Sequence, residues 1–305
     1  MRNLYITLCL TLIGFPVLGQ QDGLISNYQF NQISINPGYT GVNDITSFDL
    51  QFRKQWSGVD NSPTTTLLSG QTSLKENRLG LGFSLIHDQA GIIKNTEINL
   101  SYAYELDVGT STTLSFGIHT GLLNLNYDFG ALNIDDPSDP DFLNAEDGLS
   151  KFNLGAGLFL SSKNYYIGLS APKLLNATED IDDVGDGSRY NRHFYATGGY
   201  IFELVSNNIS IKPYTVLRFA QDTPMSADVG VSGLFAQVLW AGLFTRDFDT
   251  FGIALNLNLR NGLRVGYTGE LASDSVDESS FSTHEISLGI DLALLEMQSV
   301  VNRLF

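Results

Sequence analysis

The sequence predicts an all-β protein: a transmembrane antiparallel β-barrel of about 14 strands, with a polar N-terminal segment at its periplasmic mouth. Three observations support this. Apolar and polar residues alternate over long stretches, tight turns alternate with longer connections, and charges are few while glycine and aromatic residues are plentiful. Charged residues make up 16% of the 305, against 30 glycines and 11% aromatic residues. No later apolar stretch is long enough for a spanning helix, so a closed barrel is the structure that crosses a bilayer.

Residues 1–19 are predicted to be a signal peptide. Arg2 supplies positive charge, a mostly apolar run follows to Leu18, and Val17 and Gly19 are the small residues expected before a cleavage site. The only cysteine, Cys9, lies in this leader. We therefore expect an exported mature chain without disulfides, which is stabilised by packing and hydrogen bonding alone.

Residues 20–44 are predicted to be a periplasmic or plug segment. The stretch 28–41 reads YQFNQISINPGYTG, which has too few core-forming residues for a strand and too few helix formers for a helix. Because it precedes the first strand, it can fold into the lumen as a plug or stay outside as a docking arm. Ile33, Ile35 and Tyr39 need cover from water, which favours an ordered segment over a disordered one.

Residues 45–293 are predicted to form the barrel, because alternation with period two indicates strands. In NTEINLSYAYEL, for example, Ile98, Leu100 and Tyr102 share one face, whereas Asn99 and Ser101 share the other. Several strands approach the roughly 9–11 residues that a tilted strand needs to cross a bilayer. The predicted strands cover residues 45–53, 64–74, 79–87, 95–106, 111–126, 151–161, 164–171, 192–203, 208–220, 226–235, 237–246, 249–259, 262–270 and 282–293.

The connections predict the topology. The tight turns KENR, DVGT, SK, VSNN, AQ and RNG alternate with connections that include long stretches at 127–150, 173–191 and 271–281. Outer-membrane barrels have short periplasmic turns and longer external loops. The first strand is therefore expected to start in the periplasm, and the apolar C-terminal tail, residues 294–305, is expected on the same side.

Charged residues on the predicted inner face have both signs, which argues against a strongly ion-selective channel. They can line a water-filled pore, pair with one another, or bind the N-terminal segment, and the sequence leaves these alternatives open. The residues are Asp49, Arg53, Glu97, Glu105, Lys212, Arg218, Arg260, Arg264, Glu285 and Asp291.

Two predicted outer loops, around residues 128–151 and 177–190, hold much of the acidic charge behind a net charge of −16. Carboxylates beside Gly and Pro can bind Ca²⁺, yet neither loop has the spacing of the twelve-residue calcium motif. We therefore interpret the loops as a hydrophilic outer surface, with a partner-binding surface as a further option, and expect no cofactor. The acidic balance also argues against a nucleic-acid partner.

We do not expect an enzyme. The chain has no GxSxG motif, zinc spacing or phosphate-binding loop, and His87, His119, His193 and His284 stand in no catalytic pattern. Trp56, like other aromatic residues near strand ends, fits an interfacial girdle, although it can also anchor a contact at an outer loop.

The stretches SNYQFNQISINPGYTG, FRKQWSGVDNSPTTTLLSGQTSL and NRLGLGFSLIHDQAG, in this order, resemble the PorP/SprF family of outer-membrane proteins. The family has Ala where Gly38 and Thr40 stand here, and it usually ends at its last strand. The resemblance covers nearly the whole mature chain, and it assigns partner-binding or plug roles to the matching motif residues. These are Asn36, Pro37, Tyr39, Gly41, Arg53, Gln55, Trp56, Asp88 and Gly91.

The resemblance implies a component of the type IX secretion and gliding machinery in the bacterial outer membrane. Its implied partners are a secreted adhesin, or the C-terminal domain of one, and a periplasmic peptidoglycan-binding envelope protein, beside the lipid bilayer itself. The alternative is a general, porin-like diffusion channel, in which the mixed-sign inner face lines an open pore.

Overall fold

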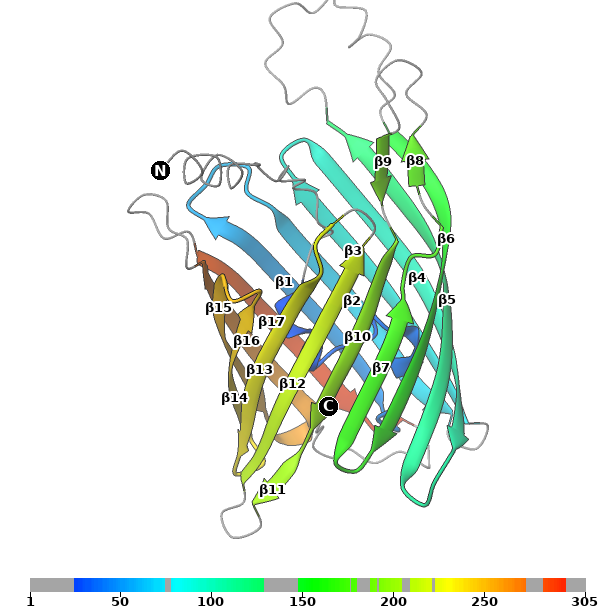
Figure 1. Cartoon of the computed structure of the whole chain (residues 1–305), viewed down its shortest axis with the longest axis vertical. Coiled ribbons are helices and arrows are strands. Elements are labelled where there is room, and N and C mark those ends of the chain that lie inside the picture. The colour runs from blue at the N-terminus through cyan, green and yellow to red at the C-terminus, as the bar shows by residue number, and fades with distance from the viewer. Residues whose placement is uncertain are drawn as a thin grey trace, which may run out of the picture.

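The computed structural model describes residues 25–74, 78–128, 148–175, 177–179, 187–190, 192–204, 209–220, 223–272 and 282–294. These residues form a closed antiparallel β-barrel of 14 strands (Figure 1), which confirms the predicted fold class and strand number. The first seven strands are β1 (Thr46–Ser57), β2 (Thr64–Leu74), β3 (Leu79–Ala90), β4 (Ile93–Asp107), β5 (Thr112–Tyr127), β6 (Gly148–Ser162) and β7 (Tyr165–Ala171).

The other seven strands begin with β10 (His193–Tyr200), which β11 (Phe202–Leu204) continues along the same neighbour. They go on with β12 (Ile209–Ala220), β13 (Ser226–Phe235), β14 (Leu239–Arg246), β15 (Thr250–Asn258), β16 (Leu263–Ala272) and β17 (Ser282–Leu292). The pairing of β1 with β17 closes the ring, and Phe48 stands opposite Ile290 in its register. A separate hairpin, β8 (Ala177–Glu179) and β9 (Gly187–Tyr190), lies between β7 and β10 in the chain.

The two ends of the barrel differ in their connections. At the end where β1 begins, called here the short-turn end, every connection has at most four residues; one of them contains the short helix η5 (Arg260–Gly262). The opposite, long-loop end carries the longest connections, between β5 and β6 and between β7 and β10. It also has two tight hairpins, at Gly91 and at Asp247–Asp249. Strands β3 and β4 therefore run closer to their shared turn than the sequence predicted, because Gly91 adopts φ +58° there.

The barrel wall has its apolar side chains outside and its polar side chains inside. Leu100 on β4 is 65% exposed, whereas Arg53 on β1 is 2% exposed, and the same alternation runs along the other strands. Such a distribution is stable where hydrocarbon surrounds the wall and each backbone group is paired within the closed sheet. Among the described residues, no helix is long and apolar enough to span a bilayer.

Strands β4 to β6 extend beyond this apolar belt at the long-loop end, where Figure 1 shows them reaching further than β13 to β16. Along β5 the outward residues change from Ile118 and Leu122 to Asn124 and Asn126. On the inner face the change is reversed, since Leu125 is buried where positions nearer the barrel centre are polar or small. The change from apolar to polar outward residues marks the boundary of the lipid-facing surface on this strand at the long-loop end.

We expect Ile118→Arg to destabilise the barrel by about 2–4 kcal/mol, because it places a charge near the middle of the lipid-facing belt. Asn126→Arg is the matched control on the same strand and the same outward face, and we expect it to cost about 0–1 kcal/mol. Denaturant titration in lipid vesicles measures both free energies of unfolding. Equal costs at the two positions would contradict the assigned membrane boundary.

Candidate functional site

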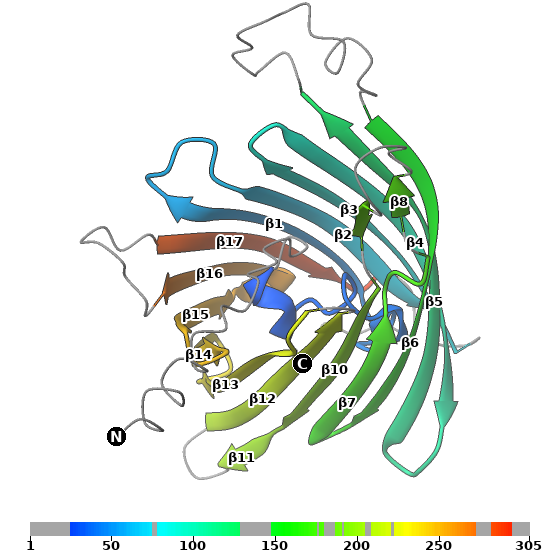
Figure 2. The same cartoon turned by 45° about the horizontal axis from the view of Figure 1, so that its top comes forward.

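Residues 25–44, called here the luminal segment, lie inside the barrel, where Figure 2 shows them in blue surrounded by the strands. The segment contains two short 3₁₀ helices, η1 (Ser26–Gln29) and η2 (Pro37–Tyr39). Residues 26–33 and 36–41 are all buried. The structure therefore places the described part of the predicted N-terminal segment inside the lumen.

The luminal segment binds the wall through side-chain hydrogen bonds to many different strands. Asn31 donates to the Ser69 hydroxyl on β2 at 2.8 Å, and Gln29 accepts from Ser232 on β13 at 2.8 Å. Further contacts reach β5, β6, β7, β10 and β17. Amide side chains both donate and accept, so they can satisfy a wall of hydroxyl and amide groups. This explains why the segment is rich in Asn and Gln and poor in core-forming residues.

Around the beginning of this segment lies a set of buried or nearly buried ionic groups, called here the charge cluster. It contains three guanidinium and three carboxylate groups. The residues are Arg53, Arg218, Arg246, Asp228, Glu270 and Glu285. Equal numbers of the two signs keep the formal charge of the cluster at zero, which is the condition under which buried charges are tolerated.

Ser26 lies in the middle of the charge cluster. Its backbone N–H and that of Asn27 donate to the two carboxylate oxygens of Glu285, at 2.8 and 3.0 Å. The Ser26 hydroxyl accepts from Arg53 at 2.6 Å and from Arg246 at 3.2 Å, and it donates to Glu270. The first turn of the luminal segment thus completes the hydrogen bonding of charges that belong to β1, β14, β16 and β17.

Asp228 on β13 is the second centre of the charge cluster. It accepts from Arg246 at 3.1 Å, from Arg218, and from the Tyr28 hydroxyl of the luminal segment. The luminal segment thus adds a phenol donor to the two guanidinium groups around this carboxylate.

Further ionic groups lie along the lumen. Arg264 binds Asp49 at 2.8 Å and Asp291 at 3.0 Å near the short-turn end, and Lys212 lies against the rings of Phe30 and Trp240. The predicted mixed-sign inner face therefore exists, and the described part of it forms ion pairs and contacts with the luminal segment. The side chain of Arg260 lies outside the described residues.

A second stretch folds against the inner wall after the end of β7. After β7 the chain turns inward over residues 172–175, where Lys173 reaches Glu97 on β4 at 3.0 Å. The Asn153 side-chain amide donates to the Leu175 carbonyl at 2.9 Å, and its oxygen accepts from the Leu175 backbone N–H at 3.2 Å. The buried His119 ring contacts the Pro172 carbonyl, so this histidine has a structural partner.

Glycines of the wall let the backbone of the luminal segment approach closely. A Cβ added to Gly117 on β5 would lie 2.2 Å from the Pro37 carbonyl, and one added to Gly80 on β3 would lie 2.0 Å from the Thr40 oxygen. Gly41 itself needs its left-handed φ of +84° to turn toward β1. The Gly-rich strand that carried the resemblance is thus a contact surface for the luminal segment.

The predicted motif residues fall into two groups. Asn36, Pro37, Tyr39 and Gly41 are buried in the luminal segment. Asn36 caps η2 by accepting from the Gly38 N–H at 2.8 Å, and Tyr39 packs edge-on against Phe159 with ring centres 5.3 Å apart. Arg53 joins this group through the charge cluster.

The second group lies at the long-loop end, away from the luminal segment. Trp56 is 52% exposed and has φ +47°, and Gln55 donates its backbone N–H to Pro63. Asp88 stands opposite Asn95 near the end of β3, and Gly91 lies in the following turn. The structure therefore does not bring Gln55, Trp56, Asp88 and Gly91 into one site with the motif residues of the luminal segment.

Sequence reasoning missed four residues of the luminal ion pairs. Asp228, Arg246 and Glu270 lie at strand positions that alternation places inward, yet the predicted set of inner-face charges did not include them. Lys173 was missed because it follows β7 in a stretch predicted to be an outer loop. Most of the acidic stretches that were interpreted as a hydrophilic outer surface, with Ca²⁺ binding as the alternative, lie outside the described residues, and the described part contains no cluster of three metal-ligating side chains.

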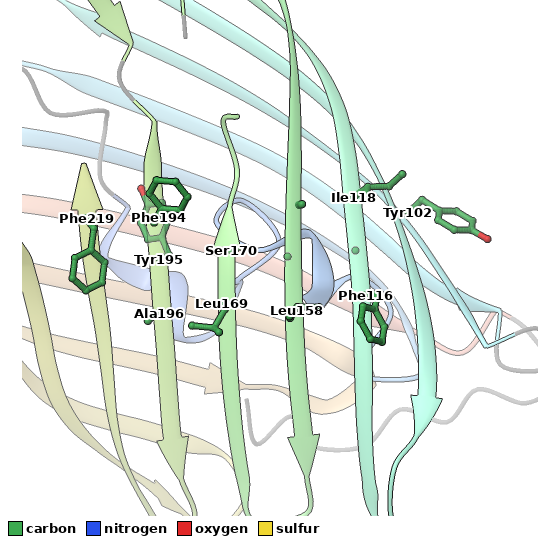
Figure 3. A pocket seen from close by; sticks show the side chains of 13 residues that line it. Tyr102, Phe116, Ile118, Leu158, Leu169, Ser170, Phe194, Tyr195, Ala196 and Phe219 are labelled. Atoms are coloured by element: carbon green, nitrogen blue, oxygen red, sulfur yellow. The ribbon is translucent and has the colours of Figure 1, made fainter. Parts of the chain in front are cut away.

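An apolar groove of about 670 Å³ lies on the outer wall across β4, β5, β6, β7, β10 and β12. Figure 3 shows its rim, where Phe116, Leu158, Leu169 and Phe194 extend from the strands. Ala196 lines the groove with a small side chain, whereas Phe194 on the same strand is large. It opens toward the lipid-facing side and is therefore separate from the luminal segment.

Comparison with known families and structures gives the following matches. A family model described as "Type IX secretion system membrane protein PorP/SprF" matches residues 17–290. No curated protein shows significant similarity. Similar solved structures include Acinetobacter baumannii Omp33, with 10% identity, a TM-score of 0.47, and coverage of 83% of this chain and 100% of that chain. They also include the Pseudomonas putida toluene transporter TodX, with 12% identity, a TM-score of 0.46, and coverage of 86% and 92%. These likenesses are too distant to bear on function.

We expect Gly117→Ala to weaken the fit of the luminal segment and destabilise the protein by about 1–3 kcal/mol, because backbone must move to admit the methyl group. Gly109→Ala is the matched control, since a Cβ there meets nothing closer than 3.5 Å. Thermal unfolding in detergent, followed by the gel shift of folded barrels, compares the two. The same transition temperature for both variants would contradict the close contact with Pro37.

Removal of one charge from the cluster should be costly. We expect Arg53→Met to destabilise the protein by about 3–5 kcal/mol, since Glu270 and Glu285 then lose a buried partner. The control is Arg78→Met, which breaks an exposed ion pair to Asp107 of 2.8 Å and should cost at most about 1 kcal/mol. Denaturant titration measures both variants. A double variant, Arg53→Met with Glu270→Gln, should recover part of the loss, and no recovery would contradict the electrostatic explanation.

Proposed function

The chain belongs to the PorP/SprF family of type IX secretion system membrane proteins, and from this premise we propose that it acts in secretion by binding partner proteins. As a transmembrane β-barrel of that family it lies in the bacterial outer membrane. The proposed mechanism is binding, without a catalytic step or a cofactor.

The observation that supports binding over solute passage is the occupied lumen. The luminal segment contacts strands on all sides of the barrel, from Ser69 on β2 to Ser170 on β7 and Asp228 on β13. Described charges of both signs on the inner wall form ion pairs with one another, and Lys212 lies against two aromatic rings, so these groups do not form an open ring of one sign along a water-filled path. A diffusion channel needs the opposite arrangement, a continuous aqueous pathway lined by solvated groups.

The two ends of the barrel suit two kinds of partner. With short turns toward the periplasm, as in other outer-membrane barrels, the long-loop end faces outward and offers the exposed Trp56. This end is where we propose that an exported adhesin, or its C-terminal domain, binds. The short-turn end would then bind a periplasmic peptidoglycan-associated protein, and together the two contacts would support surface attachment and gliding.

The occupied lumen is tested by conductance in planar bilayers. We expect the purified wild-type barrel to stay closed and a variant lacking residues 25–44 to show stable single-channel currents, because removal of the segment opens the lumen. Gly109→Ala, purified in the same way, controls for leakage caused by handling. Sustained wild-type currents would favour the diffusion channel instead.

The secretion role is tested in cells that lack this chain. We expect a cargo with a type IX export signal to accumulate inside the envelope of such cells, and the wild-type gene to restore its appearance at the surface. Unchanged export in the deletion strain would overturn the assignment to the secretion machinery, whatever the conductance of the barrel.

A further inference from the structure

The outer surface of the two ring-closing strands changes from apolar to polar at one cross-strand pair. Toward the long-loop end, the outward residue after Phe52 on β1 is Lys54, and the one after Ile286 on β17 is His284. Lys54 stands directly opposite His284 in the register, and both side chains are exposed. Directly opposed residues of an antiparallel pair share one face, so the two side chains are neighbours on the outside of the barrel.

The imidazole of His284 is held by the neighbouring strand. The Tyr267 hydroxyl on β16 lies 2.7 Å from His284 Nδ1, and the centres of the two rings are 6.0 Å apart. Gly269 is the residue directly opposite His284, and a Cβ added there would lie 3.1 Å from the Tyr267 hydroxyl. The missing side chain at Gly269 thus leaves room for the phenol to reach the imidazole. Tyr267 and His284 therefore form a polar pair beside Lys54.

Lys54 and His284 lie at the boundary of the lipid-facing surface. The outward row that contains them continues through β2, β3 and β4 to Asn126 on β5, where the lipid-facing surface ends. In register order, the residues after Lys54 are Thr64, Gln89, Lys94 and Asn126. The exposed Trp56 lies two residues beyond Lys54, and tryptophan is enriched at the level of lipid headgroups. The pair is thus placed where headgroups meet the barrel.

The two lysines of this row differ in their partners. Lys94 forms an ion pair with Asp128 at 2.7 Å, whereas Lys54 forms no ion pair within the part of the chain that the structure describes. A lysine at this position can lay its apolar stem along the lipid-facing surface and keep its ammonium group at the headgroups. The nearest source of negative charge at that level is the phosphate of a lipid.

We propose that Lys54, His284 and Tyr267 form a binding site for the phosphate group of a lipid in the outer leaflet, with lipid A as its chemical type. Lysine binds phosphate as a point charge with three donors, and the imidazole and phenol add polar groups beside it. The exposed Phe52 and Ile286 lie next to the site on the same two strands and offer an apolar surface to the acyl chains. The site rests on the proposed function only for which leaflet it faces.

The proposed lipid site lies back to back with the charge cluster. Arg53 and Glu285, which precede Lys54 and follow His284 in the chain, stand opposite each other in the same register and form an ion pair of 3.4 Å inside the barrel. A lipid phosphate that contacts Lys54 and His284 would join the first and last strands from the outside at the same position. Because a ligand that binds only the folded state stabilises it, the bound lipid should stabilise the closure of the ring.

Native mass spectrometry of the purified full-length barrel in detergent, titrated with lipid A, tests the site. Lys54→Gln removes the charge and Lys54→Arg keeps it, while His284→Leu removes the imidazole. The matched control is Lys163→Gln, which removes an exposed lysine in the turn between β6 and β7 at the short-turn end. A neutral glycolipid with the same number of acyl chains tests the need for phosphate, and inorganic phosphate is added as a competitor. The gel shift of folded barrels verifies each variant.

We expect Lys54→Gln to weaken the binding of lipid A about fivefold, the effect of one cation at an anionic lipid surface. His284→Leu should weaken it about threefold, as for the loss of one hydrogen bond, and Lys54→Arg and Lys163→Gln should bind as the wild type does. Lipid A should also raise the transition temperature of the wild type more than the glycolipid does.

Unchanged binding by Lys54→Gln, an equal loss in Lys163→Gln, or equal binding of the neutral glycolipid would overturn the proposal. Complete displacement of lipid A by inorganic phosphate would also overturn it, because the acyl chains would then contribute nothing. The assay contains neither a cargo nor a periplasmic partner, so its failure and a failure of the secretion role are distinguishable.

Discussion

The arrangement of this protein depends on the burial of ionic groups inside a wall whose outer surface faces hydrocarbon. Because lipid surrounds the outer face, the strands carry apolar residues outward and direct charged residues into the lumen. Arg53, Arg246, Asp228, Glu270 and Glu285 then lie within reach of one another. Buried charged groups need hydrogen-bonding partners for their remaining donors and acceptors. The wall strands do not supply all of these partners at the centre of the lumen. The first turn of the luminal segment, at Ser26, supplies the missing contacts.

This constraint explains the composition of the luminal segment and of the wall together. The segment does not form a single hydrophobic core with the barrel. Its apolar residues occupy separate small clusters, such as Tyr39 with Phe159 and Phe30 with Trp240. Between these clusters the contacts are hydrogen bonds and ion pairs, and at Gly80 and Gly117 the two backbones touch. The contacts of the luminal segment extend from the charge cluster at Ser26 to Gly41 and Asp44 at the short-turn end.

The barrel could be predicted almost completely from the sequence. Alternation in stretches such as NTEINLSYAYEL reports directly on which residues face lipid, and tight turns limit where each strand can end. The strand ends were less predictable where the wall rises above the membrane. On β5 the outward residues become Asn124 and Asn126, and on β3 the strand continues to Ala90, so the hydrophobic signal stops while the hydrogen-bonded ladder continues.

The candidate site was predicted only in part. The Asn36, Pro37, Tyr39 and Gly41 motif lies in the lumen, but the same resemblance also included Trp56 and Gly91, which lie at the far end of their strands. The sequence by itself determined the barrel, the number of strands and the side of each residue, because these depend on local period and on turn length. Only the tertiary structure decided that Arg246 and Glu270 meet Ser26, that Asp228 meets Tyr28, and that the segment lies inside the lumen. These contacts join residues about 200 or more positions apart, and closure of the ring, not any local pattern, sets which of them become neighbours.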